Sequence, residues 1–112
     1  MIKISTKELY EVRTKVAKAL AHETRLEIID ILKEHQNRCV CELTEELKVS
    51  QSSVSKHLGI LKNAGIVDSR KEGLNVSYYL RTPCVTNFFT CLDRILEEDF
   101  KKRKEQLDLM SN

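Results

Sequence analysis

The sequence predicts a mainly α-helical domain that carries one β-hairpin, an α+β class, and three observations predict it. The composition suits helices, because the 112 residues include just 3 Gly and 1 Pro among many Lys, Glu and Leu. Apolar residues recur at three- and four-residue intervals over most of the chain, as they do on the buried face of a helix. Between residues 66 and 80 this period gives way to two short β-prone runs around a turn.

The length predicts a single domain over residues 1–112, with a core over 7–100 and a charged, frayed tail over 101–112. Aromatic residues make up 5% and Trp is absent, so aliphatic side chains must fill the core. The longest apolar runs are too short to span a bilayer and no secretory leader is visible, so we expect a cytoplasmic protein without a membrane partner. Four cysteines in such a protein are expected to be thiols.

Two helices are predicted before residue 35. The first covers residues 7–20, with Thr6 as its N-cap and one apolar face made of Leu9, Val12, Val16 and Leu20. The second follows His22-Glu23-Thr24 and is apolar around much of its girth, so it should be the most buried helix.

The middle of the chain predicts a helix-turn-helix followed by a hairpin. A helix at about 41–47 and a polar helix capped by Ser50 are joined by about three residues. Gly65 suits the left-handed turn that ends the second of these helices. Extended runs over 66–70 and 76–80 then flank a basic tip at 71–75. This order of elements is that of a winged helix-turn-helix, in which the hairpin is the wing.

The last helix opens at Thr82-Pro83 and has a wide apolar face. That face is made of Val85, Phe88, Phe89, Leu92, Ile95, Leu96 and Phe100. Because the core of so short a chain has little room for this surface, we expect a homodimer whose interface is made by the first and last helices.

The charge distribution indicates a nucleic-acid partner. The net charge is +2, but residues 51–81 alone carry five basic and two acidic side chains. Small and amide side chains on the polar helix suit base contacts in a major groove, and the basic hairpin suits the DNA backbone or minor groove. His57 borders the buried stripe of Val54, Leu58 and Leu61, so a hydrogen-bonded link between helices is its alternative role. The candidate contacts to double-stranded DNA are Gln51, Ser52, Ser53, Ser55, Lys56, His57, Arg70, Lys71 and Asn75.

Cys39 and Cys41 stand just before the helix-turn-helix and indicate a soft-metal site, because thiolates select arsenite, cadmium, lead or zinc over harder ions. In a regular helix, side chains two residues apart point about 200° apart, so the pair can chelate only where the backbone is not helical. Cys84 and Cys91 lie about 10 Å apart along the last helix, too far to share an ion. Cys84 is the preferred third sulfur, and Cys91 is expected to pack among apolar residues.

Several segments together resemble the ArsR/SmtB family. They are Leu20-Ala21-His22-Glu23-Thr24-Arg25-Leu26-Glu27-Ile28, Cys39-Val40-Cys41-Glu42-Leu43, Ser50-Gln51-Ser52-Ser53-Val54-Ser55-Lys56-His57-Leu58, the run from Leu61 to Val67, and Arg70-Lys71-Glu72-Gly73 with Tyr78-Tyr79-Leu80. The resemblance implies a homodimeric repressor that leaves its operator when an inducer binds, with a recognition helix over 50–61 and a wing tip over 71–75. The Cys-Val-Cys sequence is similar to that of the arsenite and cadmium/lead branches. This similarity implies arsenite or antimonite as inducer, cadmium, lead or zinc as alternatives, and no organic cofactor.

The sequence departs from these relatives in three places. Thr44 occupies the position where arsenite sensors often carry a third Cys, no Cys precedes Cys39, and residues 83–100 lack the His of the zinc-sensing branch. A thiol redox or persulfide switch that links Cys84 or Cys91 to a cysteine near Cys39 is therefore an alternative. A protein-interaction module is a further one. An enzyme is not expected, because no catalytic grouping or phosphate-binding Gly loop is evident.

Overall fold

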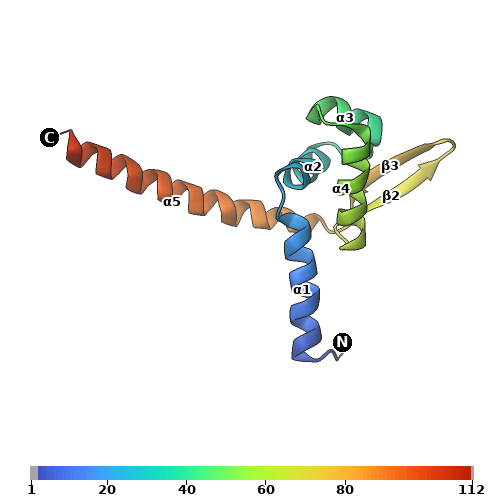
Figure 1. Cartoon of the computed structure of the whole chain (residues 1–112), viewed down its shortest axis with the longest axis horizontal. Coiled ribbons are helices and arrows are strands. Elements are labelled where there is room, and N and C mark those ends of the chain that lie inside the picture. The colour runs from blue at the N-terminus through green and yellow to red at the C-terminus, as the bar shows by residue number, and fades with distance from the viewer. Residues whose placement is uncertain (1–2, 112) are drawn as a thin grey trace.

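A computed structural model describes residues 3–111 and has five α-helices, a short 3-10 helix and three strands within that range. In chain order they are α1 (Thr6–Leu20), α2 (Glu23–Glu34), β1 (Arg38–Cys39), α3 (Val40–Leu47), α4 (Gln51–Asn63), β2 (Val67–Glu72), β3 (Asn75–Leu80), η1 (Pro83–Thr86) and α5 (Asn87–Met110). Figure 1 shows α2, α3, α4 and the hairpin gathered in one body, from which α5 extends as a single long helix. The expected mainly α fold with a β-hairpin wing is confirmed.

The core lies between α2, α3, α4 and the base of the hairpin. Helix α2 contributes Ile28, Ile29 and Leu32, none of which has exposed surface, so α2 is deeply buried as predicted. The other buried apolar residues are Ala19, Leu20, Leu43, Val54, Leu58, Leu61, Ile66, Val67 and Leu80. All of these residues are aliphatic, as the scarcity of aromatic residues requires.

The sheet has three antiparallel strands in the order β1-β3-β2. Strands β2 and β3 pair from Val67↔Leu80 to Glu72↔Asn75, and Gly73 takes a φ of +63° in the two-residue turn between them. Strand β1 was not predicted, because two residues are too few to show a period. It places Cys39 opposite Ser77, so the cysteine pair begins at an edge of the sheet.

Two of the predicted residues at helix ends are found in their predicted roles, and the predicted N-cap of α1 is not. The Ser50 Oγ accepts a hydrogen bond from the Ser53 N–H at 3.2 Å, which confirms Ser50 as the N-cap of α4. Gly65 follows α4 with a φ of +82°, as expected. The N-cap of α1 is Ser5 and not Thr6, since the Ser5 Oγ accepts from the Glu8 N–H at 3.1 Å.

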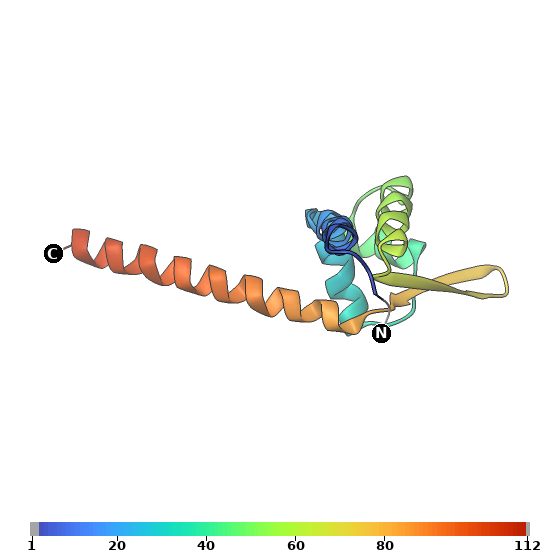
Figure 2. The same ribbon diagram turned by 90° about the horizontal axis from the view of Figure 1, so that it is seen from below.

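The last helix differs from the prediction at both ends. Pro83 opens the separate 3-10 turn η1, and α5 begins only at Asn87. The expected fraying beyond residue 100 is also wrong, because α5 continues through Met110. An Asp99–Arg103 ion pair at 3.2 Å, four residues apart, supports this part of the helix. Figure 2 shows α5 projecting away from the rest of the chain, on the side opposite the hairpin.

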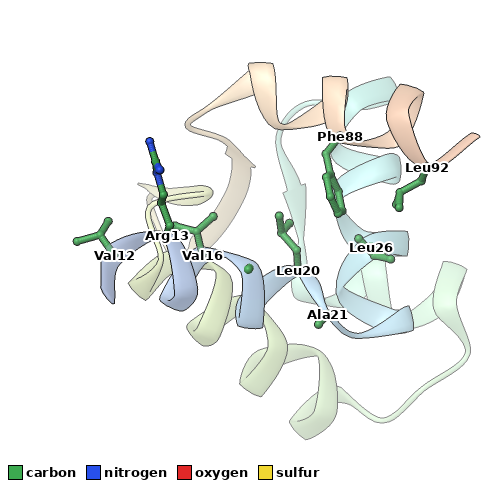
Figure 3. Close-up of a pocket in the computed structure, with 9 residues that line it drawn as sticks. Val12, Arg13, Val16, Leu20, Ala21, Leu26, Phe88 and Leu92 are labelled. Carbon is green, nitrogen blue, oxygen red and sulfur yellow. The ribbon is translucent and has the colours of Figure 1, made fainter. Parts of the chain in front are cut away.

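An apolar groove of about 540 Å³ opens between α1, the start of α2 and α5. In Figure 3, Phe88 and Leu92 of α5 face Leu20 and Leu26 across this groove. Beyond it, Leu96 and Phe100 continue the apolar face of α5 and remain 64% and 71% exposed. Within residues 3–111, no helix is both long enough and apolar enough to cross a membrane.

Candidate nucleic-acid interface and thiol pair

Helix α4 presents a polar outer face because its inner face is held by α3. Leu43 of α3 is completely buried and Leu47 packs at the edge of the same core. The connection turns through Lys48, whose φ of +57° is left-handed and ends α3. With its apolar stripe facing inward, α4 leaves four candidate DNA contacts exposed, and they are Gln51, Ser52, Ser55 and Lys56. Ser53 is half-buried beside the cap.

The hairpin that follows α4 in the chain carries exposed basic side chains. Arg70, Lys71 and Asn75 are all exposed, and the Arg70 guanidinium lies 5.3 Å from the centre of the Tyr79 ring. Lys62 has a different role from these residues. Its Nζ donates to the Ser69 Oγ at 2.8 Å and lies 3.9 Å from the Asp68 carboxylate, so it ties α4 to the wing.

His57 lies on the inner side of α4, and its inclusion among the DNA contacts is wrong for this structure. His57 is only 8% exposed, and its Nδ1 lies 3.3 Å from Arg25 Nη1. The structure shows the alternative role instead, a hydrogen-bonded link between helices, here from His57 on α4 to Arg25 on α2. Burial, together with the nearby His22, Arg25 and Lys56, lowers the pKa of His57 below the usual 6.5.

Cys39 is the N-cap of α3, a role that was not predicted from the sequence. The Glu42 N–H donates to Cys39 Sγ at 3.4 Å, and the Cys39 N–H donates to Glu42 Oε1 at 3.1 Å, which forms a capping box. Arg38 pairs with the second oxygen of Glu42. The bonds from the Cys39 backbone, the Cys39 side chain and Arg38 lower the pKa of Glu42. A glutamate three residues after the cap is the signal that could have identified this box.

The two thiols of the pair have different surroundings. Cys39 has extended backbone, with φ −82° and ψ 166°, whereas Cys41 is exposed in the first turn of α3. The predicted requirement for non-helical backbone is therefore met at one of the two positions. Thr44, at the place of the missing third cysteine, has a buried hydroxyl without a hydrogen-bond partner.

Within residues 3–111 of one protomer, no third cysteine is grouped with Cys39 and Cys41. Cys84 lies exposed in η1, and Cys91 is exposed on α5 rather than packed among apolar residues as expected. Among residues 3–111 no three Cys, His, Asp or Glu side chains are grouped closely enough to hold a metal ion. The protomer thus offers a two-thiol arrangement, and any complete three-sulfur site needs a ligand from elsewhere.

Comparison with known proteins places this geometry in a family. The model of the arsR family of bacterial regulatory proteins matches residues 22–69. An uncharacterised HTH-type transcriptional regulator of Methanocaldococcus jannaschii is 41% identical over 88 residues, which cover 79% of this chain and 99% of that protein. The arsenical resistance operon repressor of Escherichia coli is 44% identical over 63 residues, covering 56% of this chain and only 54% of that relative.

A solved structure extends the likeness over most of the fold. The homodimeric winged helix-turn-helix DNA-binding domain of a possible ArsR-family regulator from Mycobacterium bovis, solved by NMR, superposes with a TM-score of 0.74. It is 27% identical, and the match covers 91% of this chain and 95% of the other.

The fold, with a polar α4 and a basic wing on one body, defines a transcriptional regulator with a winged-helix DNA-binding domain. The chain belongs to the ArsR family of bacterial regulatory proteins, which confirms the resemblance seen in its motifs.

Proposed function

We propose that this protein is a repressor that binds double-stranded operator DNA as a homodimer and releases it when a soft metal or metalloid binds Cys39 and Cys41. The observation that carries the DNA-binding part is the exposed polar face of α4 beside an exposed basic wing. In this arrangement Gln51, Ser52, Ser53 and Ser55 contact base edges in a major groove, and Lys56 contacts phosphate or guanine. Arg70, Lys71 and Asn75 contact the backbone or the minor groove.

A homodimer supplies the second recognition helix that a two-fold operator requires. The groove between α1 and α5 and the exposed Leu96 and Phe100 support an interface made by these two helices. Burial of that apolar surface is the driving force for pairing, since large exposed apolar patches are costly in water. The homodimeric state of the Mycobacterium bovis domain supports the same assembly.

Arsenite or antimonite is the inducer that the cysteine pair favours in this proposal, with cadmium, lead or zinc as alternatives. Thiolates are soft ligands, which select metalloids and soft metal ions over harder ions. The likeness to the arsenical resistance operon repressor of Escherichia coli supports a metalloid as the inducer ahead of cadmium, lead or zinc. The third ligand is Cys84, with Cys91 as the less favoured choice; the partner protomer supplies it in this arrangement of the chain, and the same protomer could supply it only after a rearrangement.

Ion binding and the capping box compete for the same sulfur. Cys39 Sγ accepts the Glu42 N–H, so an ion on that sulfur weakens the cap, and Cys41 can join it only if the first turn of α3 opens. Loss of that turn shifts Leu43 and Leu47, which pack α3 into the core beside α4. Helix α4, the proposed recognition helix, then loses the support that orients it for the major groove of DNA.

The wing contacts are tested by a double substitution, Arg70→Ala with Lys71→Ala. We expect DNA affinity to fall about tenfold and the dependence of log affinity on log salt to become shallower by about 1 for each phosphate that is no longer neutralised. Fluorescence anisotropy with duplex DNA from upstream of the protein's own coding sequence, over a series of salt concentrations, measures both quantities. Lys33→Ala with Lys101→Ala removes the same charge from exposed positions away from the wing, and its salt slope should match the wild type. Equal slopes in all three proteins would contradict the assigned wing contacts.

The inducer site is tested with Cys39→Ser, Cys41→Ser and the double variant. Arsenite should weaken DNA binding by the wild type by about 10- to 100-fold, a range typical of coupling between two sites. Each serine variant should bind DNA normally without arsenite and remain bound when arsenite is added, because a hydroxyl does not replace a soft ligand.

Control measurements separate the ions and the ligands. Cadmium, lead and zinc are titrated in parallel, and the thiolate-to-metal absorption counts the bound sulfurs. Cys91→Ser should behave as the wild type, whereas Cys84→Ser should lose part of the response. Arsenite-driven release of DNA by the double variant would refute the assigned pair. A defined internal Cys–Cys linkage in mass spectra after oxidant or polysulfide treatment, without a retained ion, would favour a redox switch instead.

A further inference from the structure

Arg25 joins three helices at one point, and the functions proposed above do not use it. Its Nε donates to the carbonyl oxygen of Ala19 at 2.7 Å, and its Nη2 donates to that of Lys18 at 3.3 Å. Both carbonyls belong to the last turn of α1. Its Nη1 lies 3.3 Å from Nδ1 of His57, on the inner side of α4. The guanidinium of Arg25 on α2 therefore holds the end of α1 and the middle of α4 together.

In two histidines near this point, the ring Nδ1 accepts a hydrogen bond. Arg has donors and no acceptor, so Nδ1 of His57 must be the acceptor, and the ring is neutral with its proton on Nε2. Nδ1 of His22, the N-cap of α2, likewise accepts from the Thr24 N–H at 3.1 Å. The centres of the two rings are 4.4 Å apart. We call His22, Arg25 and His57 the α1–α2–α4 clasp.

The surroundings of the clasp favour the neutral form of His57. The groups that act on its charge are His22 at the start of α2, Arg25 within α2 and Lys56 on α4 itself, and all three are basic. The residue is 8% exposed, so water stabilises a charge there only weakly. Protonation would also place a second N–H donor against the guanidinium of Arg25, and the hydrogen bond to that group would break.

We propose that His57 is a positioning residue for DNA recognition, and that its neutral ring orients α4 relative to α1 through Arg25. Acidification then opens the clasp and weakens DNA binding. The inference rests on the proposed operator binding. It adds a second means of regulating that binding, by pH, which does not involve the cysteines. Because α1 belongs to the proposed dimer interface, the clasp also determines how the two recognition helices of a dimer are placed relative to one another.

The sign of the pH effect follows from the direction of the pKa shift. The pKa of His57 is lower in the folded protein than its usual 6.5, so acid favours states in which the clasp is open. The stabilising contribution of His57 is complete above pH 6.5 and is lost as the pH falls through the lowered pKa. This direction is opposite to the general trend, in which added positive charge at low pH strengthens binding to DNA phosphates.

His57→Gln tests the proposal, because an amide oxygen can accept from Arg25 at any pH. At constant ionic strength, wild-type affinity for duplex DNA should fall about tenfold between about pH 8 and about pH 5.5, relative to the affinity of the Gln variant. The Gln variant should bind about as well as the wild type at pH 8 and stay constant or bind more tightly in acid. His35→Gln is the matched control, since His35 is exposed after α2, and it should keep the wild-type profile.

A second variant separates positioning from folding. His57→Leu fills the site without an acceptor, and it should bind DNA about tenfold more weakly at pH 8, with the weakness persisting at all pH values. Urea unfolding of each variant establishes the fraction that is folded under the binding conditions. Restoration of affinity by Gln and not by Leu, in proteins that are equally folded, supports the positioning role.

The results that would overturn the proposal are distinct from those that would overturn operator binding. Parallel pH profiles for the wild type and His57→Gln would overturn the clasp and leave operator binding intact. Absence of DNA binding by every variant at pH 8 would overturn operator binding instead. Long-range ¹H–¹⁵N correlation spectra of the free protein then still decide the clasp. A proton on Nδ1 of His57 at neutral pH would refute it, and a proton on Nε2 alone would support it.

Discussion

Leu96→Asp combined with Phe100→Asp is expected to give a folded monomer that binds operator DNA at least about 100-fold more weakly than the wild type. The two side chains are 64% and 71% exposed in the protomer, so charging them removes little from its core. In a dimer they would meet apolar surface, where an unpaired carboxylate is costly. A monomer binds one half-site at a time. It therefore loses the increase in DNA affinity that a dimer obtains by linking two recognition helices.

Size-exclusion chromatography with light scattering measures the mass, and anisotropy measures the DNA affinity. Asn87→Asp introduces charge at an exposed position on the other side of α5 from Leu96 and should leave both quantities unchanged. A double variant that remains dimeric would show that the interface does not include this part of α5. Far-UV circular dichroism verifies that the variant has kept its helices.

Leu43→Ala is expected to lower the free energy of unfolding by about 2–5 kcal/mol. Leu43 is completely buried in the core cluster that also contains Leu58 and Leu61 of α4. Removing its side chain leaves a cavity between α3 and the rest of the core, and the surroundings fill such a cavity only in part. For a domain of this size, that decrease is a large share of the total stability.

Urea denaturation followed by circular dichroism measures this difference, at one fixed protomer concentration because dimerisation contributes to stability. Leu74→Ala is the control. Leu74 is 100% exposed at the wing tip, and its removal should change the unfolding free energy by less than about 0.5 kcal/mol. A Leu43→Ala variant as stable as this control would contradict the central place given to α3.

Local sequence was a sound guide to most elements. Ser50 as a cap, Gly65 as a left-handed turn and the apolar period of α2 depend on neighbours within a few residues, and all three are found where expected. The candidate DNA contacts on α4 follow from the same reasoning, because burying one stripe of a helix exposes the opposite face. Exposure is observed for Gln51, Ser52, Ser55 and Lys56, and their contact with DNA remains a prediction.

Contacts between residues far apart in the chain could not be predicted from the spacing of apolar residues in the sequence. His57 borders a buried stripe in the sequence, and only the position of Arg25, 32 residues earlier, makes it an acceptor within the fold. Strand β1 exists because β3 pairs with it, and α5 continues past residue 100 with one i,i+4 ion pair, Asp99–Arg103, in that part of the helix. Cys91 is exposed although the next residue, Leu92, lines the apolar groove, because neighbouring side chains on a helix point in different directions.

The sequence by itself determined the fold class, the family and the surface that is expected to read DNA, because caps, turns and apolar periods act over short distances. Only the tertiary structure decided that Cys39 caps α3 through its sulfur, that no third ligand reaches the cysteine pair among residues 3–111 of one protomer, and that His22, Arg25 and His57 meet. The physical reason is common to the last two, whereas the Cys39 cap is a local contact with Glu42, three residues later. Metal sites and hydrogen-bonded clusters require atoms within a few ångströms, and folding alone brings together residues that are far apart in the chain.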